Sequence, residues 1–145
     1  SESGAAYIFE RSPAGVWNQV AYLKASNAES REFFGASVDI SGARAVVGAA
    51  RENSCTGAGE QDNACLSSGA AYVFERNANG SWDQIAFLKS SDAQVGDLFG
   101  DAVGIAGARV LVGAQSEDRC TTTEAPNMAC QDAGGVHLFD DILAP

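Results

Sequence analysis

The residues of this chain with the clearest chemical potential are four cysteines in two pairs of equal spacing. Cys55 and Cys65 stand ten positions apart, as do Cys120 and Cys130. Four cysteines permit three disulfide connectivities, and an internal repeat favours Cys55–Cys65 and Cys120–Cys130 because each repeat then closes its own loop. Zinc binding is the alternative, although zinc sites prefer closer cysteine spacing and usually include histidine. Disulfides predict an oxidising compartment, hence a secreted, periplasmic or cell-surface protein.

Three aspartates in one polar stretch form a second candidate group. Asp92, Asp97 and Asp101 are suited to holding a cation, which would make this a metal site. The alternative is that they cap turns through side-chain-to-backbone hydrogen bonds. The sequence favours capping, because the earlier copy of this stretch has Asn27 and Ala36 in place of the first and last aspartate.

The chain offers little for catalysis. His137 is the only histidine, and it lies in a predicted strand where the other copies have Tyr7 and Tyr72, so we interpret it as a packing substitution. Ser-His-Asp chemistry would depend on this one histidine as its base. No glycine-rich phosphate loop leads from a strand into a helix, and nothing singles out a carboxylate pair for glycoside hydrolysis. A non-enzymatic function is therefore expected.

The overall charge narrows the classes of partner. The formal net charge is −10 and the sequence pI is about 4.3, which argues against nucleic-acid binding through phosphates. No stretch approaches the ~20 apolar residues of a membrane span. An acidic surface of this kind suits solubility, cations or a basic partner.

An internal repeat positions all of these residues. Residues 3–11 (SGAAYIFER) return with one substitution as residues 68–76, and residues 47–49 (VGA) return as residues 112–114, both 65 positions later. A third copy begins near Gly134. A repeat of this length is one supersecondary unit that buries its apolar faces against neighbouring units. The chain is therefore read as one segment, 1–145, with repeat units 3–67, 68–132 and a partial unit 133–145.

Each repeat contains four predicted strands and no helical periodicity. In the second copy the predicted strands are 69–75, 82–89, 102–105 and 110–114. An Asn-Gly turn separates the first two, and a polar loop, a tight turn and a second long polar loop follow in order. Four strands per unit indicate a β-propeller blade. A β-sandwich is the alternative, but its strands have unequal environments, which a strict repeat does not favour.

Three motifs resemble the FG-GAP repeat, which builds the propeller of integrin α subunits and of many bacterial surface proteins. They are FGASVDI at 34–40, AVVGA at 45–49 and GAAYVF at 69–74, and their second copies lie at 99–105, 110–114 and 134–139. Segments 19–26 and 84–91 resemble the bacterial-type branch. The resemblance implies an all-β fold of four-stranded antiparallel propeller blades, with one complete and two partial blades here. Further blades would come from the parent chain or from other copies.

The chain departs from the integrin pattern at one position. Integrin-type repeats carry an Asp-rich calcium loop between the FG strand and the GA strand. The corresponding hairpins here, 41–44 and 106–109, contain no carboxylate and are too short to wrap a calcium ion, which takes 6–8 oxygen ligands. We therefore expect no cofactor, and calcium binding is not carried over to these hairpins.

Strand parity places the long polar loops together on one face of such a propeller, as the integrin-like resemblance also implies. Function concentrates on long loops that a rigid scaffold supports. Loops 50–67 and 115–133 are therefore the expected contact surface, although stiffening of a long loop is an alternative role for each cysteine pair. The candidate ligand-binding residues are Glu52, Asn53 and Asp62 in the first loop and Glu117, Asp118 and Arg119 in the second.

The expected function is adhesion or protein–protein contact at an extracellular surface, with a protein or a glycan as ligand. The alternatives are a lectin-like carbohydrate binder whose copies complete a ring, and a structural surface or filament assembly unit. Trp17 and Trp82 are suited to stacking on sugars, but their position at the start of a repeated outer strand indicates packing. Asn79 begins a glycosylation sequon, which is also a simple Asn-Gly turn.

Overall fold

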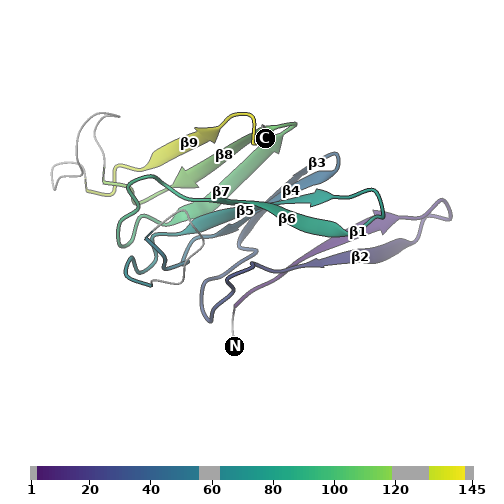
Figure 1. The fold of residues 1–145 in the computed structure, drawn as a ribbon, viewed down its shortest axis with the longest axis horizontal. Helices are drawn as coiled ribbons and strands as arrows, with labels where there is room; N and C mark the ends of the chain where they lie inside the picture. Colours follow the sequence, from purple (N-terminus) through teal and green to yellow (C-terminus); the bar gives the residue numbers. More distant parts are fainter. Residues whose placement is uncertain (1–2, 56–62, 119–130, 143–145) are drawn as a thin grey trace.

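The computed structural model describes residues 3–55, 63–118 and 131–142, and within them the regular elements are all β-strands. The strands form three antiparallel sheets, which we call the first (β1–β2), second (β3–β6) and third (β7–β9) sheet (Figure 1). This confirms the predicted all-β fold with one complete four-stranded unit. The strands are β1 (Ala6–Arg11), β2 (Trp17–Leu23), β3 (Ser37–Ser41), β4 (Arg44–Ala49), β5 (Ala70–Arg76), β6 (Trp82–Leu88), β7 (Phe99–Ala106), β8 (Arg109–Ala114) and β9 (Gly135–Phe139).

The main departure from the predicted strands is the start of β7. The sequence places this start at Ala102, whereas the strand begins at Phe99, which pairs with Ala114. The register shifts between Phe99 and Ala102, so the Phe-Gly dipeptide enters the sheet through an irregular pairing that period-two patterning does not reveal.

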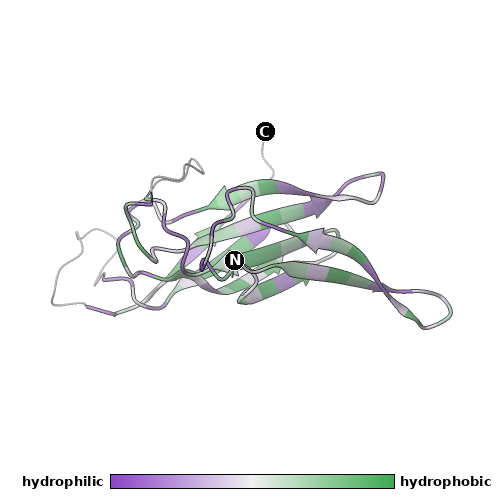
Figure 2. Cartoon of the chain, turned by 90° about the horizontal axis from the view of Figure 1, so that it is seen from below, coloured by the Kyte–Doolittle hydropathy of each residue, from purple (hydrophilic) through white to green (hydrophobic). Residues whose placement is uncertain are grey.

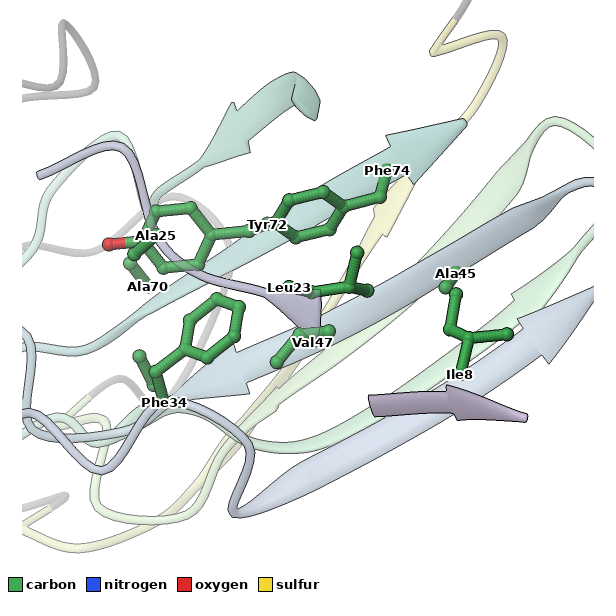
Figure 3. Packing of buried hydrophobic residues seen from close by; sticks show 10 residues of the cluster. Ile8, Leu23, Ala25, Phe34, Ala45, Val47, Ala70, Tyr72 and Phe74 are labelled. Carbon is green, nitrogen blue, oxygen red and sulfur yellow. The ribbon is translucent and has the colours of Figure 1, made fainter. Parts of the chain in front are cut away.

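The three sheets stack through two apolar clusters. Between the first and second sheets, Ile8 and Leu23 pack against Val47, Tyr72 and Phe74 (Figure 3). Successive residues of a strand point to opposite faces, so the second sheet also presents residues to the third. There Val46 and Val73 meet Val110, Val112 and Phe99 on the third sheet. The central strands of the second sheet, β4 and β5, are thus buried on both faces.

Each Phe-Gly segment is attached to a glycine that precedes a neighbouring strand. Isolated parallel bridges join Gly4 to Phe34 and Gly69 to Phe99. A Cβ atom on either glycine would lie 2.0 Å from the carbonyl oxygen of its phenylalanine, and both glycines have positive φ. Glycine is therefore required for the close backbone contact between one sheet and the first strand of the next.

The connections sort into two groups at opposite ends of the molecule. The tight hairpin turns lie at one end, and the connections from β2 to β3, from β4 to β5 and from β6 to β7 lie at the other (Figure 1). Hydrophobic residues are concentrated in the strands (Figure 2). This arrangement agrees with the strand-parity prediction, and we call the end with the long connections the loop end.

Candidate functional site

The connections at the loop end are hydrogen-bonded to one another. The amide of Gly96 donates to the carbonyl oxygen of Leu66 at 2.9 Å, and Leu98 donates to Ser67 at 3.1 Å. On the other side, the amide of Arg51 donates to the carbonyl oxygen of Glu32 at 3.3 Å. The β4–β5 connection is therefore anchored to both neighbouring connections, which gives the loop end a defined backbone.

The predicted disulfide between Cys55 and Cys65 is present, with an S–S length of 2.05 Å and a Cα–Cα distance of 5.0 Å. Asn53 closes the same loop, because its carbonyl oxygen accepts from the amide of Cys65 at 3.0 Å and its Oδ1 from the amide of Ser67 at 2.8 Å. The predicted Cys120–Cys130 pair lies outside the described residues.

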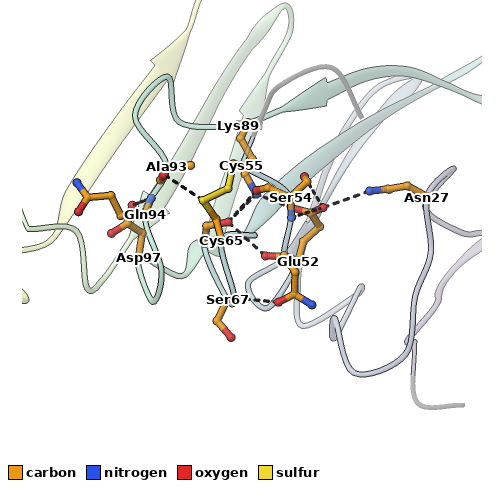
Figure 4. A network of polar contacts seen from close by, with 12 residues as sticks. Asn27, Glu52, Ser54, Cys55, Cys65, Ser67, Lys89, Ala93, Gln94 and Asp97 are labelled. Atoms are coloured by element: carbon orange, nitrogen blue, oxygen red, sulfur yellow. Dashed lines mark hydrogen bonds and ion pairs between the residues drawn. A yellow bond between two sulfur atoms is a disulfide. The ribbon is translucent and has the colours of Figure 1, made fainter. Parts of the chain in front are cut away.

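A buried ion pair between Glu52 and Lys89 lies beneath this loop (Figure 4). Both side chains are 1% exposed. Glu52 Oε1 also accepts from Ser54 Oγ at 2.6 Å and from Asn27 Nδ2 at 3.2 Å, while Lys89 Nζ donates to Ser68 Oγ at 2.8 Å. A carboxylate that is desolvated and bonded in this way cannot contact a ligand, so the prediction that Glu52 is a binding residue is wrong.

Glu117 occupies the equivalent position in the connection that follows β8 and is also buried. Its Oε2 lies 2.7 Å from Nε2 of His137. The same correction applies to Glu117, which supports the loop rather than presenting itself to a ligand. His137 packs edge-on against Phe99, as the packing interpretation requires, and it also pairs with this carboxylate.

Two of the three aspartates of the possible metal site make local hydrogen bonds, and Asp97 caps a turn. Asp97 is buried, and its Oδ2 accepts from the amide of Gln94 at 2.7 Å. Asp92 Oδ1 accepts from Ser90 Oγ at 2.7 Å. Across residues 3–55, 63–118 and 131–142, no group of three or more His, Cys, Asp or Glu side chains is placed to hold a metal ion. The bond from Gln94 to Asp97 is the turn-capping role that the sequence analysis favours for these aspartates.

Burial governs the ionisation of the acids at this end. Desolvation raises the pKa of Asp97 above its ordinary value, and the neighbouring Glu117 and Asp118 raise it further. Desolvation likewise raises the pKa of Glu32, although the amide of Glu29 opposes this by donating to Glu32 Oε2 at 2.7 Å.

Tyr72 is held neutral by the same environment. Desolvation, assisted by the charge of Glu52, raises the pKa of its phenol. The neutral hydroxyl donates to Oδ1 of Asn27 at 2.7 Å. Because Asn27 in turn donates to Glu52, the aromatic core of the second sheet is hydrogen-bonded to the buried ion pair.

The remaining predicted contact residues divide into two groups. Asn53 and Asp118 are partly exposed, although Asp118 Oδ1 already accepts from the amide of Asp132 at 2.8 Å. Asp62 and Arg119 lie outside the described residues. Asn53 and Asp118 thus remain available at their exposed edges, and both also stabilise their loops.

An exposed aromatic–cation pair was missed by the sequence analysis. Arg51 Cζ lies 4.7 Å from the ring centroid of Phe33, and both side chains are exposed at the loop end. In the second copy these positions are Leu98 and Ser116, so the pair does not repeat. A departure from an otherwise conserved internal repeat was the signal that could have found it.

The sheets and their loop end match a known family. The model of the FG-GAP repeat matches residues 17–74 and 82–139, which together make up most of the chain. The chain belongs to the FG-GAP repeat family. FG-GAP repeats form β-propeller-like modules for protein interaction, so the second sheet is a complete FG-GAP blade and the other two are partial blades. A search among curated proteins finds no match to this chain.

The FG-GAP assignment bears on location and activity only in general terms. FG-GAP repeats and a disulfide are typical of extracellular proteins, and the family fold serves binding and structural roles. In the part of the chain that the structure describes, no helix has the length and apolar character needed to cross a membrane.

Proposed function

We propose that this FG-GAP segment is an extracellular adhesion or contact module that binds a protein ligand with its loop end. The observation that carries the proposal is the Phe33–Arg51 pair, an exposed aromatic and guanidinium in contact on a hydrogen-bonded frame. Aromatic residues and arginine are enriched among the residues that dominate protein–protein binding energy. Neither side chain is needed for the apolar clusters between the sheets, which leaves both free to serve recognition.

The frame around this pair supports a binding role because it limits the entropy lost when a ligand binds. Asn63 Nδ2 in the β4–β5 connection donates to Glu29 Oε2 in the β2–β3 connection at 2.9 Å. The Cys55–Cys65 disulfide closes a loop within the β4–β5 connection. The buried Glu52–Lys89 pair holds the base of the same loop. Side chains on such a base are preorganised for one ligand geometry.

The overall charge favours a basic partner. With a net charge of −10, the chain attracts a cationic protein surface over long range, and this attraction weakens as salt screens it. Arg51 adds a local positive group, which suits a partner with a carboxylate or an aromatic ring at its centre. The proposed ligand is therefore a protein with a basic rim around such a group.

A binding screen tests this proposal. We would probe immobilised extracellular protein domains and, in parallel, a glycan array with the purified chain. The expected result is saturable binding to a protein that Phe33→Ala and Arg51→Ala each weaken by tenfold or more, since central interface residues contribute about 2 kcal/mol or more. Val16→Ser is the matched control, because Val16 is an exposed apolar residue in the hairpin turn at the opposite end.

The lectin alternative depends on Trp17. Trp82 packs against the first apolar cluster and is not available as a sugar platform, whereas its equivalent Trp17 is exposed. Glycan binding that disappears in Trp17→Ala and persists in Arg51→Ala would overturn the protein-ligand proposal. Absence of binding to both arrays would overturn it as well.

A further inference from the structure

The β2–β3 and β6–β7 connections at the loop end share one backbone frame. In the first, the amide of Glu29 donates to Glu32 Oε2 at 2.7 Å. In the second, the amide of Gln94 donates to Asp97 Oδ2, also at 2.7 Å. The carbonyl oxygens of Glu32 and Asp97 each accept, at 3.3 Å, from an amide in the connection that follows β4 or β8. Because the frame is the same in both copies, differences between the exposed side chains on it are not required by the fold.

Three exposed side chains distinguish the first copy of this frame from the second. They belong to two neighbouring connections, since the amide of Arg51 donates to the carbonyl oxygen of Glu32. The first copy carries Arg31, Phe33 and Arg51, all exposed, where the second carries Gly96, Leu98 and Ser116. All three side chains are larger in the first copy, and two of them add a positive charge.

Arg31 is retained at a position that favours glycine. Its φ is 72°, in the left-handed region, and its counterpart Gly96 has a φ of 90°. A Cβ atom at Gly96 would meet nothing within 4 Å, and Arg31 is exposed, so packing does not explain a side chain here. Phe33 and Leu98 both have a φ of 57°, so the strain at that position belongs to the shared frame, whereas the strain at Arg31 does not. Strained residues of this kind cluster at functional sites.

The guanidinium groups of Arg31 and Arg51 have no oxygen partner within residues 3–55, 63–118 and 131–142. The other arginines in these ranges each bond to an oxygen of the protein, and they are Arg11, Arg44, Arg76 and Arg109. Arg51 contacts the ring of Phe33, but a cation–π contact supplies no oxygen acceptor for its N–H donors. In a chain with a net charge of −10, two neighbouring guanidinium groups that no described carboxylate pairs with are suited to an anion from a partner.

We propose that Arg31 and Arg51 together bind one carboxylate of the protein ligand, and that an apolar residue beside this carboxylate packs on Phe33. The inference rests on the proposed function and names the chemical group that the loop end recognises, an aspartate or glutamate side chain. Guanidinium groups bind carboxylates in bidentate geometry, which supplies direction as well as affinity. The ring of Phe33 orients Arg51 beforehand, so less entropy is lost on binding.

A protein carboxylate matches this site better than the sulfate groups of a glycan chain. A sulfated glycan is a polyanion, and the net charge of −10 repels it over long range. A single acidic side chain carries less charge, and the basic rim of the proposed ligand offsets it. The aromatic ring also favours a protein, since it provides a surface for an apolar neighbour of the carboxylate.

An array of octapeptides tests this proposal. Each peptide carries a central aspartate with an apolar residue beside it, and a matched peptide carries asparagine at the same place. The purified chain is expected to bind a subset of the aspartate peptides. Each asparagine counterpart is expected to bind at least tenfold more weakly by fluorescence anisotropy, because the charge-assisted hydrogen bonds are lost. Equal binding of the two members of each pair would overturn the proposal, as would absence of binding to every peptide.

Variants that exchange the two arginines for the residues of the second copy locate the binding. Arg31→Gly and Arg51→Ser are each expected to weaken binding of the aspartate peptides tenfold or more. Arg11→Ser removes an exposed arginine at the end of β1, at the opposite end of the molecule, and should bind like the wild type.

Arg31→Gly also separates binding from folding. It replaces a strained residue with glycine, so its midpoint in urea unfolding is expected to equal or exceed that of the wild type. Loss of binding in a variant of unreduced stability is then an effect on the site. Unchanged affinity of Arg31→Gly for the aspartate peptides would contradict the proposal.

Two further outcomes separate this inference from the proposed function. If a ligand from the protein-domain screen depends on Phe33 and Arg51 but binds Arg31→Gly as it binds the wild type, the proposed function stands and the two-arginine site is wrong. If a heparin tetrasaccharide displaces the peptides and binds more tightly than any of them, the site belongs to a sulfated glycan and the carboxylate assignment is wrong.

Discussion

Two polar clusters at the loop end occupy equivalent positions in the repeat but differ in chemistry. The first cluster consists of Asn27, Glu32, Glu52 and Tyr72, and the second of Asp92, Asp97, Glu117 and His137, each 65 positions later. Both clusters place a buried carboxylate under a β-strand connection. The repeat therefore preserves the frame while the partners of the carboxylate change.

The difference lies in how each buried carboxylate is compensated. Glu52 is paired with the ammonium group of Lys89 and accepts a hydrogen bond from Nδ2 of Asn27. Glu117 is paired with the imidazole of His137. Lys24, the counterpart of Lys89, directly follows β2 and donates to Ser3 Oγ at 2.6 Å. The comparison teaches that one lysine position serves a buried ion pair in one copy and a backbone-anchoring contact in the other.

The largest effect is expected from Lys89→Met. This change leaves Glu52 buried without its cation, and removal of one partner from a buried ion pair costs about 3–5 kcal/mol of unfolding free energy. Urea unfolding measures this loss. Lys24→Met is the matched control, with an expected loss below about 1 kcal/mol because Lys24 is partly exposed. Equal losses in the two variants would contradict the distinction between the two positions.

The double variant Glu52→Gln with Lys89→Met refines this prediction. Removing both charges eliminates the uncompensated carboxylate, so most of the lost stability is expected to return. If the double variant is as unstable as Lys89→Met, packing of the lysine stem rather than charge holds the loop.

Loss of the disulfide is expected to rank next. Replacing Cys55 and Cys65 with serine opens a loop with a sequence separation of 10 and is expected to lower the unfolding free energy by about 2–3 kcal/mol. Urea unfolding of the double serine variant, beside wild type with and without reductant, provides the measurement. The unfolding free energy of the serine variant should stay below that of the oxidised wild type, and reductant should lower that of the wild type to a comparable extent. If reductant leaves the unfolding free energy of the wild type unchanged, hydrogen bonds alone hold the loop between residues 55 and 65.

A smaller effect is expected from Tyr72→Phe. The change removes the donor to Asn27 and leaves a buried amide oxygen without that bond, at a cost of about 1–3 kcal/mol. Tyr7→Phe makes the same substitution at the exposed counterpart, where the change should stay within about 0.5 kcal/mol. Thermal unfolding of both variants compares them, and a similar loss in both would argue against the bond to Asn27.

The smallest expected effect concerns pH. Asp97 has a raised pKa in the native state, so above about pH 4 the unfolded chain releases a proton that the native state retains. This group therefore stabilises the fold least when the pH has risen above its native pKa. Asp97→Asn is expected to reduce the loss of stability with rising pH in that window, as measured by urea unfolding from pH 3.5 to pH 7.

Glu32→Gln provides the companion measurement at the first cluster. The pKa of Glu32 is also raised by burial, but Lys24 opposes the rise, whereas the charges that influence Asp97 are all carboxylates. The change in slope is therefore expected to be smaller for Glu32→Gln than for Asp97→Asn. A larger change for Glu32→Gln would reverse the electrostatic ranking of the two clusters.

The sequence predicted the strands well because their formation depends on local patterns that the repeat displays twice. Alternation in 82–89 and the Asn-Gly turn before it predicted β5, β6 and their hairpin, and the cysteine spacing predicted the Cys55–Cys65 disulfide. Sequence reasoning failed on Glu52 and Glu117. A carboxylate in a polar loop is predicted to be exposed, because the sequence does not show which distant residue will pair with it. Folding brings Lys89 beside Glu52 and His137 beside Glu117.

The sequence by itself determined the repeat, the order of strands and the end of the molecule at which the long connections lie. Only the tertiary structure decided which copies of a repeated residue are buried. Tyr7 and Tyr72 have the same local sequence and the same kind of cross-strand aromatic neighbour, yet Tyr7 is 53% exposed and Tyr72 is 0% exposed. The physical reason is that strand pairing arises within one sheet, whereas burial requires a second sheet to cover the first.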